Sequence, residues 1–123
     1  MVTAPLISVV DDDESVRESL PDLLREFGFA VEAVASAEEF LASGAASRTS
    51  CLVLDVRMPG MSGLELQHEL AHRQQAIPIV FITAHGDDTL RPRLIAGGAV
   101  ECLLKPFSET ALLGAVNAAL GRG

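Results

Sequence analysis

Four charged residues stand where apolar runs of this sequence end. Asp11 and Asp12 follow one run near the start, Asp55 follows a second at mid-chain, and Lys105 follows a third near the end. If these runs are parallel strands packed side by side, their carboxyl ends meet at one edge of a sheet and bring the four residues together. We therefore expect an acidic pocket that faces one lysine.

Such a pocket has a definite chemistry. Carboxylates that converge repel one another, and a hard dication with oxygen ligands relieves the repulsion. Mg²⁺ suits the pocket because it prefers oxygen ligands and keeps several of its waters. One carboxylate could then attack a phosphoryl group, since the metal and the lysine ammonium neutralise charge on the transferred oxygens. Each residue alone could cap a helix or end a strand, but such accidents have no reason to share a pocket.

The elements that must position these residues alternate between two hydrophobic patterns. Five short apolar runs have the length of strands buried on both faces. Between them, apolar residues recur at helical spacing. Five strands alternating with five helices predict right-handed crossovers and a doubly wound α/β fold with a parallel sheet. The expected strands are Leu6 to Val10, Ala30 to Val34, Cys51 to Leu54, Ile77 to Ile82 and Val100 to Leu104.

Local signals indicate where the helices begin and end. Ser36-Ala37-Glu38-Glu39 and Ser62-Gly63-Leu64-Glu65 have the pattern of capping boxes, so the second and third helices are expected to start there. We assign Asp13 to capping the first helix. Gly28 and Gly97-Gly98 are expected helix stops, because glycine adopts the left-handed terminal conformation at low cost.

The composition limits the class of protein. A chain of 123 residues with 49% hydrophobic residues suits one globular domain. The net charge of −8 argues against direct binding of nucleic acid. No apolar run suits a membrane span and no signal peptide is apparent, so we expect a soluble cytoplasmic protein without a membrane partner. Cys51 and Cys102 lack metal-ligand spacing and are expected to be buried free thiols.

Four segments carry a resemblance to one family. They are Val9-Val10-Asp11-Asp12, Asp55 to Gly63, Thr83-Ala84-His85-Gly86 and Lys105-Pro106-Phe107. On these segments the chain resembles the response-regulator receiver domains of two-component signalling, in the FixJ-like group of the CheY-like superfamily. The resemblance covers almost the whole chain and implies a flavodoxin-like (βα)5 sandwich with strand order 2-1-3-4-5. It also implies that residues 1–123 form a single receiver domain with no output domain in this chain.

The resemblance also implies the ligands of a Mg²⁺ ion. Asp12 would bind the ion directly and Asp11 would bind it through water. Asp55 and the backbone carbonyl of Arg57 would complete the protein ligands. These assignments rest on the match between this sequence and the family's motifs.

The function implied by the resemblance is a phosphorylation-dependent switch. Asp55 would accept a phosphoryl group from a phosphohistidine of a sensor histidine kinase, Lys105 would pair with the phosphoryl oxygens, and Thr83 would donate its hydroxyl to one of them. Only self-phosphorylation and slow self-dephosphorylation are expected, not enzymatic turnover. Phosphorylation would change the surface of helix four, strand five and helix five. That surface would control an output domain in transcription regulation, a protein partner or a homodimer.

Three other functions compete with this interpretation. His68-Glu69-Leu70-Ala71-His72 matches the zinc-metalloprotease motif, but both histidines should face solvent, opposite Leu66 and Leu70. An aspartyl-phosphate phosphatase would carry a second aspartate where this chain has Arg57. A flavin carrier of the same fold is disfavoured because the chain has no tryptophan or tyrosine to stack on the flavin and an acidic pocket in place of a phosphate cradle.

Several residues depart from the family's pattern or disturb a helix. Cys102 stands where receivers carry the aromatic residue of the switch, so coupling to the output surface must use other groups or be weak. If Asp87 or Asp88 caps helix four, Pro92 lies about one turn in and favours a late start, hence a short or mobile helix. Pro21 predicts a kink in the first helix. The Lys105-Pro106 bond could be cis, as in the family.

Overall fold

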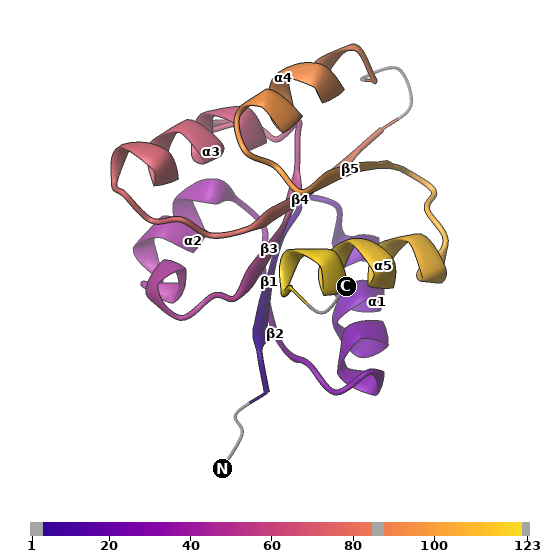
Figure 1. Cartoon of the computed structure of the whole chain (residues 1–123). Coiled ribbons are helices and arrows are strands. Elements are labelled where there is room, and N and C mark those ends of the chain that lie inside the picture. Colours follow the sequence, from indigo (N-terminus) through magenta and orange to yellow (C-terminus); the bar gives the residue numbers. More distant parts are fainter. Residues whose placement is uncertain (1–3, 85–87, 122–123) are drawn as a thin grey trace.

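The computed structural model of this chain describes residues 4–84 and 88–121, and these residues include one parallel sheet of five strands. The strand order is β2-β1-β3-β4-β5 (Figure 1). Every neighbouring pair is parallel, which confirms the doubly wound sheet and the order 2-1-3-4-5. The strands are β1 (Leu6–Val10), β2 (Ala30–Val34), β3 (Cys51–Asp55), β4 (Ile79–Thr83) and β5 (Glu101–Leu104).

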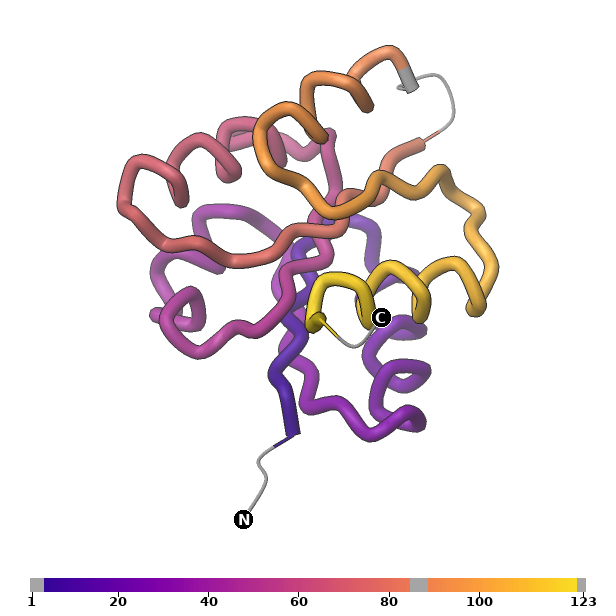
Figure 2. The backbone as a smooth tube through the Cα atoms, viewed as in Figure 1, coloured from indigo at the N-terminus to yellow at the C-terminus, as the bar shows by residue number. Residues whose placement is uncertain are grey.

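The sheet is the middle layer of a three-layer sandwich. Helices α1 and α5 cover one face, and α2, α3 and α4 cover the other (Figures 1 and 2). Side chains that alternate along the strands feed two separate apolar clusters, as expected for strands buried on both faces. The helices are α1 (Glu14–Glu26), α2 (Ala37–Ala42), α3 (Gly63–His72), α4 (Arg91–Ala96) and α5 (Glu109–Ala119), with short 3₁₀ turns η1 (Ala45–Ser47) and η2 (Asp88–Leu90).

One strand boundary differs clearly from the sequence-based expectation. The strand expected from Ile77 begins instead at Ile79, so that prediction was wrong by two residues. The amide of Ile77 donates back to the carbonyl of Gln75 at 3.0 Å. Pro78 has no N–H to add to a strand ladder, although its carbonyl accepts from Leu52 N–H at 2.9 Å. Ladder pairing therefore begins after the proline.

The local capping signals were largely correct. Asp13 caps α1 and accepts from Ser15 N–H at 2.9 Å, and the Ser15 hydrogen bonds hold the pKa of this carboxyl below its usual value. Ser62 and Glu65 form the complete capping box of α3. At Ser36 the structure shows one half of the expected box, the bond that its hydroxyl accepts from the third helical amide.

Two of the predicted glycine stops lie just after helices, and Pro21 lies inside one. Gly28 and Gly98 have positive φ values of 92° and 105° just after α1 and α4. Helix α1 continues through the buried Pro21, and a kink there stays a prediction.

Among the described residues, none of the helices combines the length and the apolar character that a bilayer crossing requires.

Helix α4 is short, as its sequence predicted. It has six residues, Pro92 lies in its first turn, and its N-cap residue Leu90 makes no side-chain capping bond. The turn η2 precedes it, beginning at Asp88, while the alternative cap Asp87 lies outside the described residues. Leu94 nevertheless anchors α4 in the core.

We expect the amides of α4 to exchange with solvent faster than those of α5. A short helix without a side-chain cap opens at low free energy, whereas α5 has eleven residues and a Ser108 cap that accepts from Ala111 N–H. Residue-resolved hydrogen exchange measures the difference, with the fully capped α3 as the reference. Equal protection of α4 and α5 would contradict the expectation.

The start of α3 presses against the end of β3. A Cβ atom placed on Gly63 would overlap the carbonyl oxygen of Asp55 and lie 3.0 Å from the Cα atom of Val56. Both neighbours are backbone, so a side chain at this position requires one element to move. The absence of a side chain at Gly63 therefore fixes how closely α3 can approach the strand that ends in Asp55.

Replacing Gly63 by alanine should destabilise the protein by about 1–3 kcal/mol, the usual cost of overpacking a core. Gly114→Ala is the matched control, because a Cβ there meets no atom within 4 Å. Alanine within α5 should raise the free energy of unfolding by about 0.5–1 kcal/mol. Urea unfolding followed by circular dichroism suits a chain with no tryptophan or tyrosine. Equal effects of the two variants would show that the contact with Asp55 is unimportant.

Candidate functional site

The carboxyl ends of four strands bring the predicted residues to one edge of the sheet. Asp11 directly follows β1, Asp55 ends β3, Thr83 ends β4, and Lys105 directly follows β5. The strand register places these ends at one level, since Asp55 pairs with Ile82 and Thr83 pairs with Leu104. The structure therefore brings together the carboxylates and the lysine that the spacing of the apolar runs predicted to converge.

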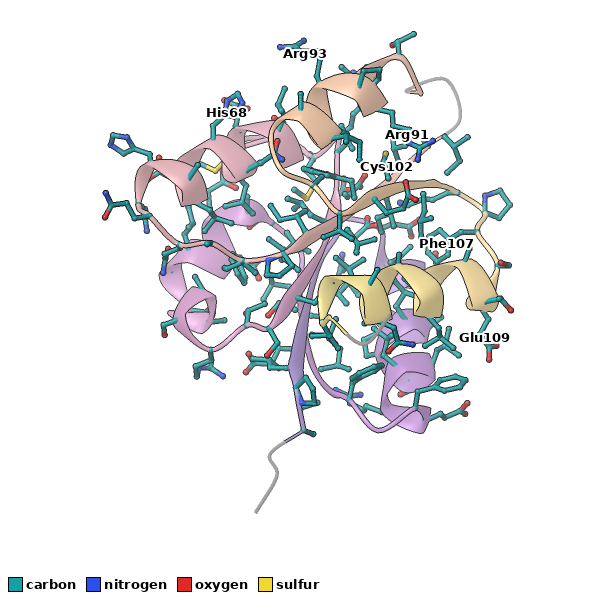
Figure 3. The ribbon with its side chains drawn as sticks, viewed as in Figure 1. His68, Arg91, Arg93, Cys102, Phe107 and Glu109 are labelled. Carbon is teal, nitrogen blue, oxygen red and sulfur yellow. The ribbon has the colours of Figure 1, made fainter. Side chains whose placement is uncertain are left out.

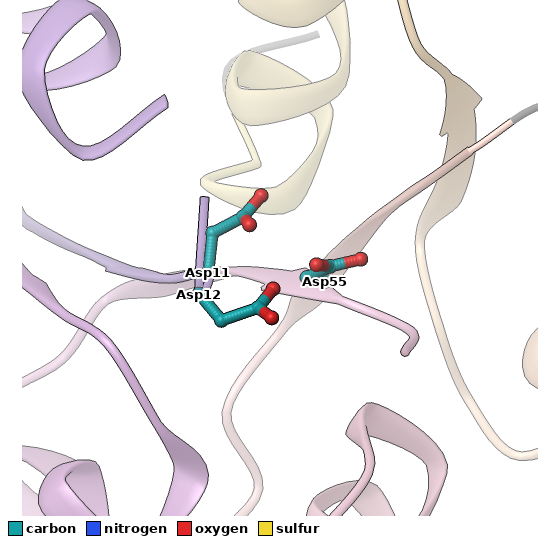
Figure 4. Close-up of side chains that lie close together, drawn as sticks. All are labelled: Asp11, Asp12 and Asp55. Atoms are coloured by element: carbon teal, nitrogen blue, oxygen red, sulfur yellow. The ribbon is translucent and has the colours of Figure 1, made fainter. Parts of the chain in front are cut away.

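Three carboxylates form a cluster in this pocket. Asp11, Asp12 and Asp55 each offer one oxygen, and these atoms all lie within 4.8 Å of one another (Figure 4). Asp11 and Asp55 are buried, whereas Asp12 is exposed. The cluster is therefore a set of hard oxygen donors with one side open to solvent, which suits an ion that keeps some of its waters.

Asp11 is the most rigidly held of the three. Its Oδ1 atom accepts from Asp13 N–H at 2.9 Å, and its backbone carbonyl accepts from Arg17 Nη1 at 3.0 Å. Its buried Oδ2 atom lies 2.9 Å from Lys105 Nζ, in an ion pair without the geometry of a regular hydrogen bond. Asp11 thus retains ligand capacity on an oxygen that faces the pocket.

The surroundings of Asp55 disfavour its charged form. The residue is only 6% exposed. Burial, followed by the charge of Asp11, raises the pKa of Asp55 to about 7, although Lys105 and the backbone N–H of Arg57 oppose the shift. That N–H lies 3.4 Å from Asp55 Oδ1, and Lys105 Nζ lies 3.8 Å from Asp55 Oδ2. A cation beside Asp55 would favour its charged form.

Lys105 is the cation that faces the cluster. Burial lowers the pKa of Lys105, but the carboxylates of Asp11 and Asp55 outweigh burial and raise it overall. The backbone N–H of Lys105 donates to Thr83 O at 2.8 Å, which ties the ends of β4 and β5 together. The peptide bond between Lys105 and Pro106 is cis, as the resemblance suggested.

Thr83 and Arg57 flank the cluster. Thr83 is buried, and its hydroxyl lies 3.5 Å from the carbonyl of the exposed Ala84. Arg57 directs its backbone N–H toward Asp55, while its side chain is exposed. The structure brings both residues to the pocket, and their roles toward a phosphoryl group or a metal stay predictions.

Two residues that support this site were missed from the sequence. Arg17 of α1 holds the carbonyl of Asp11, and Glu38 of α2 accepts from Met61 N–H at 3.0 Å in the loop after Asp55. The first contact joins α1 to the end of β1, and the second joins α2 to the loop after β3. Periodicity and capping patterns carry no signal for such contacts, because these patterns report local structure.

The competing motif and the cysteines lie away from the acidic cluster. His68 and His72 are exposed on α3, opposite the buried Leu66 and Leu70, and Figure 3 shows His68 pointing outward. Glu69, the general base of the zinc motif, pairs with Arg73 at 2.6 Å.

Cys51 and Cys102 are not in disulfide bonds. Burial raises the pKa of the Cys51 thiol to about 12, so this thiol is unreactive at neutral pH. Cys102 is half-buried in β5 and packs against the apolar cluster beneath α2, α3 and α4. Its neighbour Glu101 forms an ion pair with Arg91 of α4 at 2.5 Å, on the face where Figure 3 labels Arg91 and Cys102.

Comparisons with known proteins agree with the fold and the pocket. A family model described as the response regulator receiver domain matches residues 7–117. The chain is 52% identical over 120 residues to nodulation protein W of Bradyrhizobium diazoefficiens, covering 98% of this chain and 53% of that protein. It is 46% identical over 116 residues to the transcriptional regulatory protein FixJ of Azorhizobium caulinodans, covering 94% of this chain and 55% of that protein.

The fold has close structural counterparts as well. The structure of the response regulator StyR superimposes with a TM-score of 0.90 and 52% identity, covering 97% of this chain and 60% of that chain. The chain spans about half the length of the curated relatives named above. The family model spans the acidic cluster, Thr83 and Lys105 together with all five strands except the first residue of β1. The chain therefore belongs to the response regulator receiver domains, the signalling modules of two-component systems.

Proposed function

We propose that this chain is a phosphorylation-dependent switch with Asp55 as the phosphoacceptor. The observation that carries the proposal is the position of Asp55. Its carboxylate shares a cluster with Asp11 and Asp12 and lies 3.8 Å from the Lys105 ammonium. It is thus next to the groups that would neutralise an incoming phosphoryl group, at the solvent-facing edge of the sheet.

The donor set fits Mg²⁺. Asp11, Asp12 and Asp55 supply carboxylate oxygens, and the backbone carbonyl of Arg57 is the fourth proposed protein ligand. The raised pKa of Asp55 and the three carboxylate oxygens within 4.8 Å of one another indicate a site that a bound cation would stabilise. When bound, Mg²⁺ would neutralise charge on the carboxylates and on the transferred phosphoryl oxygens.

In the proposed reaction, an oxygen of Asp55 attacks the phosphorus of a phosphohistidine on a sensor histidine kinase. A P–O bond forms, the P–N bond breaks, and the histidine nitrogen keeps the electron pair of the broken bond. Lys105 pairs with the phosphoryl oxygens as they arrive, and Thr83 donates its hydroxyl to one of them. The residues of this chain thus act through position and charge.

The phosphorylated state should be hydrolysed slowly. The position two residues after Asp55 holds Arg57, so the pocket lacks the second aspartate that serves phosphatases of this kind as acid and base. The chain would then act only on itself and would not turn over external substrates. This distinguishes a switch from an enzyme.

Output is proposed to pass through α4, β5 and α5. Ile95, Val100 and Leu104 are exposed on or beside these elements, and such apolar groups suit a phosphorylation-dependent contact with an output domain, a partner or a second copy. FixJ of Azorhizobium caulinodans is named a transcriptional regulatory protein. We propose transcription regulation in the cytoplasm as the output, with DNA contacted by another domain, since this chain carries a net charge of −8.

Incubation with Mg²⁺ and a small acyl phosphate should add the mass of one phosphoryl group. Asp55→Asn should abolish the adduct, and Lys105→Ala should slow its formation at least tenfold, because a transition-state charge contact is lost. Asp13→Asn is the matched control, since asparagine also caps helices well. Intact mass spectrometry measures the adduct, and an adduct of undiminished yield in Asp55→Asn would exclude Asp55 as the acceptor.

Without Mg²⁺, Asp55→Asn should stabilise the protein at pH 8. A carboxyl whose folded pKa is about 7, above its unfolded value, favours the folded state below pH 4, and this contribution is lost as pH rises through 7. Asparagine removes the unfavourable charge. It should raise the free energy of unfolding by about 1–3 kcal/mol at pH 8 and by little at pH 4, given about 1.4 kcal/mol per pKa unit.

Urea unfolding with a chelator at both pH values measures this effect. Asp22→Asn, which removes an exposed charge on α1, is the control for net charge. Saturating Mg²⁺ should stabilise the original protein and leave Asp55→Asn nearly unchanged. A loss of stability in Asp55→Asn at pH 8 would contradict the electrostatic account.

A further inference from the structure

The loop that follows Asp55 spans residues 56–62 and is fixed at both ends by backbone bonds. Val56 N–H donates to Ile82 O at 3.1 Å, and Gly63 N–H donates to Val56 O at 2.9 Å. Met58 is buried in the core. The far part of the loop, at Gly60 and Met61, projects toward the start of α2.

Glu38 holds that far part of the loop. It is the second residue of α2, and its Oε2 atom accepts from Met61 N–H at 3.0 Å across 23 positions of sequence. Gly60 makes room for this contact, because a Cβ there would lie 2.5 Å from the same Glu38 oxygen. Gly60 also has a φ of 75°, in the left-handed region that favours glycine. Glu38 as acceptor and Gly60 without a side chain are thus both needed for the contact with Met61.

The contact is charge-assisted. Glu38 lies in the first turn of α2, where a negative charge is favourable. The hydrogen bond from Met61 N–H, followed by one from its own amide, holds the pKa of Glu38 below its usual value. A charged acceptor makes a stronger hydrogen bond than a neutral one.

We propose that Glu38 is a positioning residue for the Mg²⁺ site, acting through the β3–α3 loop to hold Arg57, whose carbonyl is the proposed ligand, next to Asp55. The inference rests on the proposed function, because Arg57 as a ligand belongs to that proposal. Glu38 lies outside the cluster of Asp11, Asp12 and Asp55, so its effect is on the geometry of the loop. Outer residues that orient metal ligands change metal affinity when they are replaced.

Two variants of Glu38 test the role, with Glu39→Ala as the control for lost charge on the same exposed face of α2. In metal-free protein, Glu38→Ala should speed exchange of the Met61 amide with water, measured by NMR. In an NMR titration it should weaken Mg²⁺ binding about three- to tenfold, less than loss of a direct partner of a ligand. Glu38→Gln keeps the acceptor oxygen and should restore most of both properties.

Gly60→Ala provides an independent approach to the same contact. Its Cβ atom should displace the Glu38 carboxylate and reproduce the loss of Mg²⁺ affinity seen in Glu38→Ala. In the double variant Glu38→Ala/Gly60→Ala the loss should equal that of Gly60→Ala alone, which includes the strain of alanine at a φ of 75°, because Gly60→Ala already removes the Glu38 contact. Unfolding measurements confirm that each variant is folded during the titration.

Equal Mg²⁺ affinities in Glu38→Ala and Glu39→Ala would overturn the positioning role, since only charge would then matter. Faster Met61 exchange with unchanged Mg²⁺ affinity would overturn it too, because the loop would move without affecting the site. Neither measurement uses phosphorylation. Failure of Asp55 to accept a phosphoryl group would therefore remove the proposed switch and leave the effect of Glu38 on Mg²⁺ separately measurable.

Discussion

Repulsion among three carboxylates is the constraint on which the functional part of this structure depends. Asp11, Asp12 and Asp55 offer oxygens within 4.8 Å of one another, and two of these residues are buried. Lys105 compensates only in part, because it lies closer to Asp11 than to Asp55. Burial, followed by the charge of Asp11, therefore leaves the pKa of Asp55 raised. Added positive charge would therefore stabilise the three carboxylates in their charged forms.

Backbone geometry keeps these charges together. Strands β3 and β4 are buried along their whole length, so their apolar burial offsets the local cost of the carboxylates at the edge of the sheet. Hydrogen bonds from Val56 to Ile82 and from Lys105 to Thr83 continue the sheet's pairing just past the strand ends. Gly63 brings α3 against the carbonyl of Asp55. The carboxylates are thus held by elements that have little freedom to move apart.

Features set by local sequence could be predicted, and features set by distant contacts could not. The apolar runs that form the strands could be identified, because each depends on residues within a few positions. The same holds for the Asp13 cap of α1 and the capping box that starts at Ser62. The convergence of Asp11, Asp55 and Lys105 followed from the topology of a parallel sheet. The role of Glu38 could not be predicted, because it requires knowing which loop meets which helix. Arg17 lies only six positions from Asp11, but neither periodicity nor a capping pattern marks its bond to that carbonyl. The start of β4 was placed too early because hydropathy alone does not register the missing amide of Pro78.

Because Cys102 stands in place of the aromatic residue of the family's switch, a signal from the pocket needs other contacts to reach the surface. The backbone N–H of Lys105 donates a hydrogen bond to the carbonyl of Thr83, so a change at the pocket reaches the ends of β4 and β5 directly. At the start of β5, Glu101 accepts from Cys102 N–H and pairs with Arg91, which connects β5 to the first residue of α4. Helix α4 has six residues and no side-chain cap, so its own contribution to stability is small. A ligand shifts a conformational equilibrium only by its differential affinity for the two states. Beyond the core contact of Leu94, α4 has little stability of its own, so a smaller difference in affinity can shift it, and we expect the proposed switch to operate with a thiol at Cys102.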